Sequence, residues 1–338
     1  MSPRELPPPG AVEKILIWHQ GALGDLLLAG PALLALRHHY PQARITALGQ
    51  PHFWALLTPT LSLEAVWNSA AALWSPLFLA DSPLPPSLQE RLGGMQLALV
   101  FGPQPHPTLL ARLAQAGISQ VQWLPSWPED GPEAVGAFLA GHLERLGVTG
   151  LQEPFRLLLG EDWRDQAPIL PEPGPFLAVA PGSGHPCKNW PLSHYYEVTR
   201  TLAWEQGLQV IWLAGPAEAP FLPYLKGLAA AQGHLLLADL PLTGVAAVLA
   251  RCRLYLGGDS GLTHLAAAVG VPGVLALFGP TDPRVWAPKG EGVRVLQAPC
   301  RKAPCASGRE ITCPEPRCLE NLAPGLVLKT ATALWQRG

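Results

Sequence analysis

Charge is scarce in this sequence, and neither sign is concentrated in any segment. Of the 338 residues 14% are charged, the formal net charge is −2, and Lys and Arg form no cluster. Proteins that bind nucleic acid present a positively charged surface, so we expect no nucleic-acid partner. Hydrophobic residues make up 48% of the chain, which is typical of a well-packed globular protein and not of a disordered one.

Long apolar runs are also missing. The most apolar early segment, 26–36, is interrupted by Gly30 and Pro31 and is shorter than the roughly 20 residues that span a membrane. The first residues contain the proline run at 7–9 and lack the continuous apolar region of a secretory signal. We therefore expect a flexible tail at 1–13, a cytoplasmic location, and at most peripheral contact with the inner face of the cytoplasmic membrane.

The dinucleotide-binding fingerprint is absent as well. The first glycine turn, 19–25 (HQGALGD), lacks the full G-x-G-x-x-G pattern. No acidic residue ends a second strand about 20 residues further on, where such a site would hold the ribose. A nicotinamide-dependent enzyme is therefore disfavoured.

What the sequence does contain is two series of alternating strands and helices. In the first half we expect strands at 14–18, 44–48 and 96–101, and helices at 25–40, 108–116 and 133–146. In the second half we expect strands at 176–180, 208–213, 235–237, 252–256 and 273–277, and helices at 193–205, 217–231, 243–250 and 324–336. The chain is also longer than one hydrophobic core usually allows.

The predicted fold is therefore α/β, with two Rossmann-like, doubly wound domains. The proline-rich segment between the two series marks their boundary. We expect an N-terminal domain at 14–155, a linker at 156–175, a C-terminal domain at 176–322 and a terminal helix in 323–338.

The most informative segment is 257–272 (GGDSGLTHLAAAVGVP), a glycine-rich turn between a strand and an apolar helix. The start of a helix carries unpaired N–H groups and about half a positive charge, so phosphate binds there without any lysine. The turn also follows a parallel strand, and open α/β sheets bind ligands at that end. The alternative is that Asp259 or Ser260 only caps the helix.

Three charged residues occupy other turns of this kind, each with a structural and a functional interpretation. Asp25 is either the cap and dipole partner of its helix or a general base. Lys188, after Gly-Ser-Gly at 182–184, is either a solvated loop residue or a point charge beside a bound anion. Glu218 is either a first-turn acid favoured by the helix dipole or an acceptor for ribose hydroxyls.

Together these segments resemble glycosyltransferase family 9, the ADP-heptose:lipopolysaccharide heptosyltransferases. The resemblance covers nearly the whole chain, and its segments are 21–25 (GALGD), 181–184 (PGSG), 188–191 (KNWP), 215–218 (GPAE), 258–264 (GDSGLTH) and 278–283 (FGPTDP). It implies a GT-B fold, with two domains facing across a cleft and a terminal helix that crosses back to the first domain. The implied reaction is inverting transfer of a heptose or similar sugar from an ADP-sugar to a hydroxyl of a lipid-linked or cell-envelope glycan. The resemblance implies no required metal cofactor, and the sequence has no D-x-D metal signature.

The resemblance also implies roles for individual residues. Asp25 would take the acceptor proton and Lys188 would meet the charge that develops on the departing diphosphate. Glu218 and Gly215 match the nucleoside site, and His19 and Gly24 the acceptor side. The implied donor and phosphate site comprises Ser183, Lys188, Asp259, Ser260, Gly261, Leu262, Thr263 and His264.

The acceptor side departs from the family pattern. Where family members often carry a basic residue and a serine, this chain has His19 and Gly21, and between Thr46 and Ala111 its one Lys or Arg is Arg91. An acceptor rich in phosphate or Kdo carboxylate would need more cations, so we expect a less anionic glycan. A UDP-sugar transferase or epimerase of GT-B fold and a catalytically silent nucleotide-sugar-binding protein are alternatives, and we expect a monomer.

Four of the six cysteines form a C-x4-C-x7-C-x4-C array at Cys300, Cys305, Cys313 and Cys318. Zinc sites usually have tighter pairs and a longer separation between them. A structural metal, one or two disulfides, and reduced thiols therefore stand as equal alternatives, although disulfides are uncommon in the cytosol.

Overall fold

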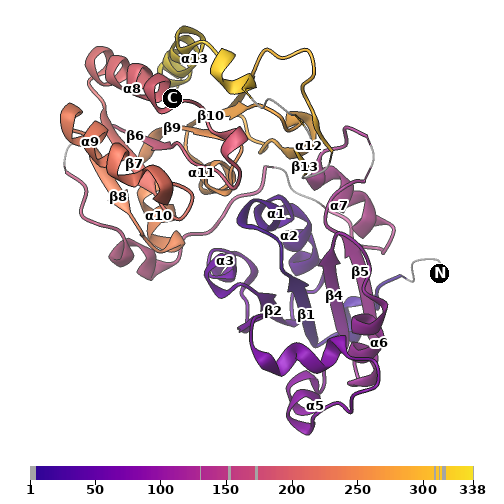
Figure 1. The fold of residues 1–338 in the computed structure, drawn as a ribbon. Helices are drawn as coiled ribbons and strands as arrows, with labels where there is room; N and C mark the ends of the chain where they lie inside the picture. Colours follow the sequence, from indigo (N-terminus) through magenta and orange to yellow (C-terminus); the bar gives the residue numbers. More distant parts are fainter. Residues whose placement is uncertain are drawn as a thin grey trace. The chain divides into compact units, whose positions relative to one another are not determined.

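The computed structural model describes residues 5–129, 131–150, 154–171, 174–307, 310–311, 313 and 317–337. The chain divides into two units, Met1–Glu153 and Pro154–Gly338, and each is built around a parallel sheet with helices on its faces (Figure 1). This confirms the predicted α/β class with two doubly wound sheets. Within the described residues, no helix is both long enough and apolar enough to cross a membrane.

The first unit has five parallel strands in the order β3-β2-β1-β4-β5. Its centre is β1, where Ile15, Leu16 and Ile17 are fully buried, because a central parallel strand is covered on both faces. The strands are β1 Lys14–His19, β2 Arg44–Gly49, β3 Ala65–Asn68, β4 Leu97–Gly102 and β5 Gln120–Pro125. The α-helices are α1 Leu23–Leu28, α2 Gly30–His39, α3 Pro51–Trp54, α4 Thr58–Leu61, α5 Pro86–Leu92, α6 Pro107–Gln115 and α7 Val135–Glu144, with 3-10 turns at Pro9–Ala11 and Ala72–Phe78.

Two expectations for this unit need correction. The single helix expected at 25–40 is two helices, which meet at Ala29, because Pro31 has no N–H to donate back into α1. Strands β3 and β5 were not expected from the sequence. Both are edge strands and largely half-buried, so their sequences lack the continuous apolar run that marks a central parallel strand.

The second unit has six parallel strands in the order β11-β10-β9-β6-β7-β8. They are β6 Phe176–Ala180, β7 Gln209–Ala214, β8 Leu235–Ala238, β9 Cys252–Gly258, β10 Gly273–Phe278 and β11 Val293–Gln297, and the two short strands β12 Ala306–Ser307 and β13 Glu310–Ile311 pair in antiparallel fashion. The helices are α8 Leu192–Gln206, α9 Leu222–Gln232, α10 Leu242–Leu249, α11 Gly261–Val269, α12 Pro283–Trp286 and α13 Pro324–Arg337, with 3-10 turns at Glu161–Gln166, Pro186–Lys188, Ala219–Phe221 and Cys318–Asn321. The helix expected from 217 thus begins later, at Leu222, after a 3-10 turn.

The strand order of the second unit creates a switch point. From β6 the chain adds β7 and β8 on one side of the sheet and then returns to place β9 on the other side of β6. The loops that leave β6 and β9 therefore part in opposite directions. A crevice at the carboxyl ends of two such strands is where open α/β sheets bind ligands.

Two further segments belong to the second unit. Residues 156–171 lie in the expected linker, yet Trp163 is buried and the Thr243 hydroxyl on α10 donates a hydrogen bond to Gln166. Helix α13 packs against α8 and against strands β9 and β10, burying Val327 and Ala331. The linker role of 156–175 and the return of the terminal helix to the first domain stay predictions.

Candidate functional site

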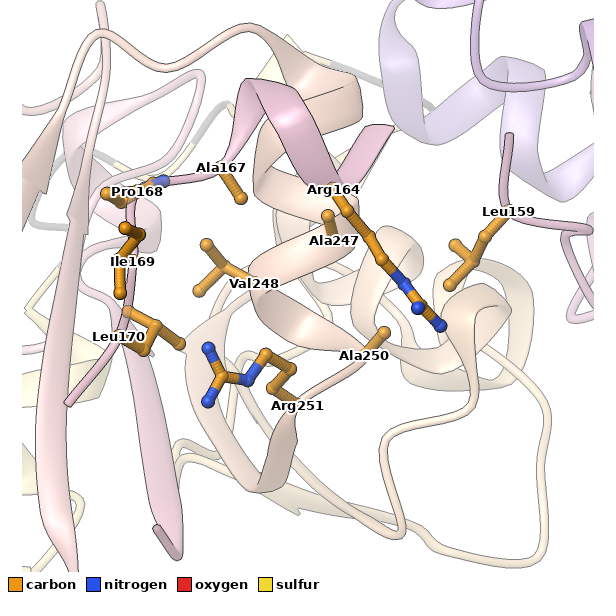
Figure 2. A pocket seen from close by; sticks show the side chains of 10 residues that line it. All are labelled: Leu159, Arg164, Ala167, Pro168, Ile169, Leu170, Ala247, Val248, Ala250 and Arg251. Atoms are coloured by element: carbon orange, nitrogen blue, oxygen red, sulfur yellow. The ribbon is translucent and has the colours of Figure 1, made fainter. Parts of the chain in front are cut away.

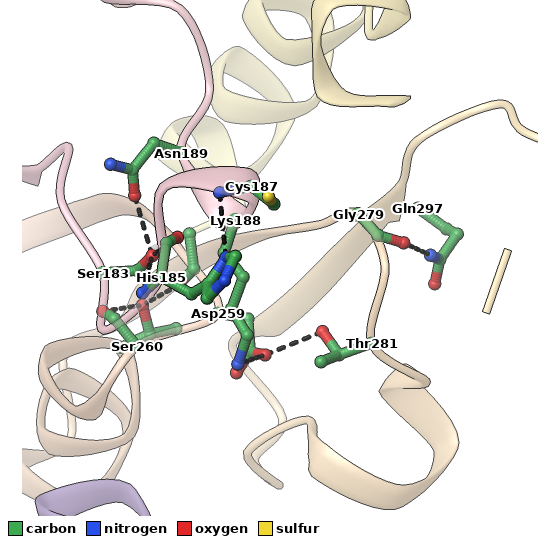
Figure 3. Close-up of polar contacts among 12 residues, drawn as sticks. Ser183, His185, Cys187, Lys188, Asn189, Asp259, Ser260, Gly279, Thr281 and Gln297 are labelled. Atoms are coloured by element: carbon green, nitrogen blue, oxygen red, sulfur yellow. Dashed lines mark hydrogen bonds and ion pairs between the residues drawn. The ribbon is translucent and has the colours of Figure 1, made fainter. Parts of the chain in front are cut away.

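An ion pair joins the loops that leave β6 and β9. The Lys188 Nζ atom lies 2.8 Å from Asp259 Oδ2, and the Asp259 side chain is only 8% exposed. The Thr281 hydroxyl, from the loop after β10, donates to the same oxygen at 2.7 Å (Figure 3). Three loops at the carboxyl edge of the sheet are therefore held together by one carboxylate.

Helix α11 begins directly after this ion pair, and its first turn is not capped by a side chain. The N-cap residue Ser260 is extended and makes no side-chain capping bond, and the Asp259 carboxylate binds Lys188 and Thr281 instead. Within the described part of the chain, the amides of Gly261 and Leu262 donate to no acceptor. The start of this helix thus keeps its N–H groups and positive charge available for an anion.

Ser183 braces the turn that carries Lys188. Its hydroxyl lies 2.7 Å from Asn189 Oδ1 and 2.8 Å from the carbonyl oxygen of His185 (Figure 3). Ser183 is buried. Ser183 was predicted to bind the donor, and the contacts described here are all within its own loop.

Glu218 connects two loops from inside the unit. Its Oε1 atom accepts the Gly182 amide and its Oε2 atom accepts the Gly215 amide, each at 2.8 Å. Burial raises the pKa of the Glu218 carboxyl, and the bonds from Gly215 and Gly182 act in the opposite direction. Both oxygens thus have backbone partners, and the predicted ribose contact stays a prediction.

Thr263 and His264, in the first turns of α11, are buried. The Thr263 hydroxyl donates to the Gly258 carbonyl and lies 3.1 Å from the Tyr255 hydroxyl. These contacts fasten the start of α11 to the end of β9. Thr263 therefore fixes the direction of the helix that presents the Gly261 and Leu262 amides.

In the first unit, the predicted base and a predicted acceptor-side residue converge on one glycine. A Cβ atom built on Gly21 would lie 2.7 Å from His19 Cε1 and 2.8 Å from Asp25 Oδ2. Both side chains are buried, and Asp25 Oδ2 accepts the Ala22 amide at 2.9 Å. Asp25 therefore does cap the start of α1, where Gly24 also lies, and its role as a base stays a prediction.

Three polar residues of the site were not predicted from the sequence. Thr281 contacts Asp259, and Asn189 contacts Ser183. The third residue is Gln297, whose Nε2 atom donates to the Gly279 carbonyl at 2.6 Å (Figure 3). Thr281 and Asn189 stand inside segments of the family resemblance, and Gln297 ends strand β11. For Thr281 and Gln297 the usable signal was a polar side chain at or just after a strand's carboxyl end.

The cysteine array lies after β11, in the segment that leads to α13. The six cysteines of the described chain form no disulfide with one another. Burial raises the pKa of the Cys305 thiol, and a hydrogen bond with Cys313 raises it further. Among the residues that the structure describes, no three His, Cys, Asp or Glu side chains are grouped as metal ligands. The metal alternative for Cys300, Cys305, Cys313 and Cys318 stays a prediction.

A separate cavity of about 490 Å³ lies between the segment 159–170 and α10. It is lined mainly by apolar side chains, with two arginines (Figure 2): Leu159, Arg164, Ala167, Pro168, Ile169, Leu170, Ala247, Val248, Ala250 and Arg251. Arg251 directly precedes β9, so the cavity lies near the amino edge of the sheet. It contains none of the predicted site residues and is not part of the candidate site.

Comparison with known proteins identifies relatives of this chain. The model of glycosyltransferase family 9 (heptosyltransferase) matches residues 144–317, about half of the chain. Lipopolysaccharide heptosyltransferase 1 of Pseudomonas aeruginosa is 31% identical over 183 residues, which are 52% of this chain and 50% of that protein. The match thus spans about half the length of this curated relative. Lipopolysaccharide heptosyltransferase 3 of Escherichia coli is 27% identical over 299 residues, 80% of this chain and 83% of that protein.

Solved structures agree on the fold. The glycosyl transferase family 9 structure from Veillonella parvula DSM 2008 superposes with a TM-score of 0.79 at 18% identity, covering 99% of this chain and 100% of that one. At this identity the likeness shows the fold alone. The predicted GT-B fold, with two parallel-sheet α/β domains, is confirmed, and the cleft between the domains stays a prediction.

Proposed function

Because the chain belongs to glycosyltransferase family 9, the heptosyltransferase family, we propose that it is an inverting, metal-independent enzyme that uses an ADP-sugar. It transfers a heptose or similar sugar to a hydroxyl of a lipid-linked or cell-envelope glycan. The observation that carries this proposal is the uncapped start of α11 beside the Lys188–Asp259 pair. A nucleotide diphosphate is the anion that such a turn suits.

The donor site combines a fixed cation with open backbone amides. Lys188 and Asp259 neutralise each other, so the excess positive potential comes from the Gly261 and Leu262 amides. The diphosphate would bind there, and Lys188, fixed by Asp259, would meet the charge that grows on the leaving group. Preorganised donors lower a barrier because they need no reorganisation during the reaction. Gly215 and Glu218, in the next loop along the sheet, would lie on the nucleoside side.

The acceptor site is proposed for the carboxyl edge of the first sheet. Asp25 would take the proton from the acceptor hydroxyl as that oxygen attacks the anomeric carbon through an oxocarbenium-like state. His19 and Gly24 would lie beside the acceptor. The protein would act as a monomer in the cytoplasm, at most touching the membrane surface.

The distribution of cations supports an acceptor with little negative charge. The Lys and Arg residues of the described part of the first unit are Lys14, Arg37, Arg44, Arg91, Arg112 and Arg145. Lys14 and Arg44 begin their strands, at the opposite edge, and Arg112 is buried. The loops after β1, β2 and β4, at 20–22, 50 and 103–106, contain no Lys or Arg. Phosphate and Kdo carboxylate groups would therefore have no Lys or Arg partner in these loops.

Calorimetry and a turnover assay test the donor. We expect the protein to bind ADP more tightly than UDP, and to transfer sugar from ADP-heptose in the presence of EDTA. Lys188→Ala should weaken ADP binding, whereas Lys226→Ala, a change at an exposed lysine of α9, should not. A clear preference for UDP would favour the UDP-sugar alternative, and binding without turnover on any acceptor would favour a silent binding protein.

An acceptor panel tests the glycan. Neutral glycolipids and phosphorylated Kdo-lipids are offered to the purified protein with ADP-heptose. We expect transfer to neutral acceptors, and tight binding of a phosphorylated Kdo-lipid would contradict the proposed acceptor class.

A further inference from the structure

Glu218 is buried more deeply than the other two acidic residues of the candidate site. It is 2% exposed, compared with 5% for Asp25 and 7% for Asp259. A buried carboxylate is costly unless hydrogen bonds satisfy it, and both oxygens of Glu218 are satisfied by backbone amides at 2.8 Å. One amide belongs to the loop after β6 and the other to the loop after β7, so the carboxylate bridges two loops.

Gly182 allows this close approach. A Cβ atom at position 182 would lie 2.4 Å from Glu218 Oε1 and 2.8 Å from its Cδ atom. No residue with a side chain would fit without moving the carboxylate. The glycine inside 181–184 is therefore matched to Glu218, which comes from a different loop.

A short series of contacts leads from Glu218 to Lys188. Gly182, held by Glu218, is followed by Ser183, whose hydroxyl contacts Asn189 at 2.7 Å. Asn189 follows Lys188, and the Lys188 ammonium pairs with Asp259. The loop is thus fixed on one side by Glu218 and on the other by Asp259.

The surroundings of Glu218 are protein groups. Tyr195 and Tyr255 are fully buried, and their pKa values are raised mainly by burial and also by the negative charge of Glu218. The contacts of Glu218 describe a brace within the unit.

We propose that Glu218 is a positioning residue of the donor site, which acts by holding the turn after β6 in the place where Lys188 meets the diphosphate. The inference rests on the proposed function for the assignment of that turn to the donor. It differs from the ribose contact that the family resemblance implies, because a positioning residue affects the diphosphate whether or not the ribose has hydroxyl groups.

Amide hydrogen exchange tests the brace without any nucleotide. In the wild-type protein we expect protected amides at Gly182 and Gly215, and in Glu218→Ala both should exchange at least about tenfold faster. Glu218→Gln has one acceptor oxygen, so it should lose protection at one of the two and is the variant to use if Glu218→Ala does not fold. Glu197→Gln, at an exposed position of α8, is the control. Unprotected amides in the wild type, or equal protection in Glu218→Ala or Glu218→Gln, would overturn the brace.

Calorimetry with ADP and 2′,3′-dideoxy-ADP tests how the brace acts. We expect Glu218→Gln to lower the affinity for both nucleotides by the same factor. That factor is about tenfold, which corresponds to the loss of one charge-assisted hydrogen bond. Glu197→Gln should leave the affinity for both nucleotides unchanged. A loss confined to ADP would show a direct ribose contact and overturn the positioning role. If the wild-type protein binds neither nucleotide, the proposed function fails, and the exchange experiment still decides whether Glu218 holds the loops.

Discussion

The Lys188 ammonium lies 2.8 Å from the Asp259 carboxylate at the point where the second sheet reverses its strand order. The pair joins the loop after β6 to the start of α11, and Thr281 adds a third loop. A cation placed by its own protein partner is ready for a ligand before the ligand arrives. The same bond makes the pair a structural element, and the two roles can be separated experimentally.

Lys188→Ala should weaken ADP binding by more than about tenfold and destabilise the protein by roughly 1–3 kcal/mol, because it leaves the Asp259 carboxylate buried with fewer partners. The double variant Lys188→Ala/Asp259→Asn should recover part of the stability and none of the affinity. Urea unfolding and calorimetry measure the two effects. Recovery of ADP affinity in the double variant would mean that Lys188 has only the structural role.

Asp25→Asn should keep the fold, because the side-chain oxygen of the introduced asparagine can still accept the Ala22 amide that Asp25 accepts at 2.9 Å. Turnover should fall by roughly two to four orders of magnitude, the scale of a lost general base, with the affinity for ADP unchanged. Asp25→Ala should in addition cost about 1 kcal/mol for the lost cap. Unchanged turnover in Asp25→Asn would refute the role as a base.

His234 should make the stability of the protein depend on pH. Trp212 Nε1 donates to His234 Nδ1 at 3.1 Å, and burial lowers the pKa of His234 from 6.5 to about 4. Because the folded-state pKa is lowered, the stabilisation is present above pH 6.5 and is lost as the pH falls from 6.5 toward 4. The imidazolium formed there can no longer accept the Trp212 N–H.

The measurement is urea unfolding of the wild type and His234→Asn at about pH 7, 5.5 and 4.5, which span the range over which the stabilisation is lost. We expect the free-energy difference between the two proteins to shrink as the pH falls. His38→Asn, at an exposed position in α2, is the control. A difference that stays constant across the three pH values would contradict the prediction.

The thiols should all titrate when the protein is unfolded. Since the six cysteines form no disulfide with one another in the described chain, we expect six reactive thiols per chain in denaturant under metal-free conditions. In the native protein Cys252 should stay unreactive, because burial raises its pKa to about 12. Fewer than six thiols would indicate a disulfide, and elemental analysis of the native protein would reveal a metal at Cys300, Cys305, Cys313 and Cys318.

The sequence predicted those parts of the fold whose residues carry a local signal. Central strands such as β1 and β10 are continuous apolar runs because both faces are covered. The turns after β6 and β9 were recognisable because glycines closely follow each apolar run in the sequence. Strands β3, β5 and β11 were missed because an edge strand is partly exposed and its polar residues hide the pattern. The break at Ala29 was missed because Pro31 stops a hydrogen bond and leaves the apolar period intact.

For the site, the sequence alone determined which residue types stand at the carboxyl ends of the strands, and so indicated an anion site and the family. The tertiary structure decided what each of them contacts. Asp259 and Ser260 were candidates for capping α11, and the Asp259 carboxylate instead binds Lys188 and Thr281. Glu218 was a candidate for the ribose, and it accepts the amides of Gly182 and Gly215. The reason is physical: a hydrogen-bond partner is chosen by proximity in space, and parallel strands bring loops from distant parts of the chain to one edge of the sheet.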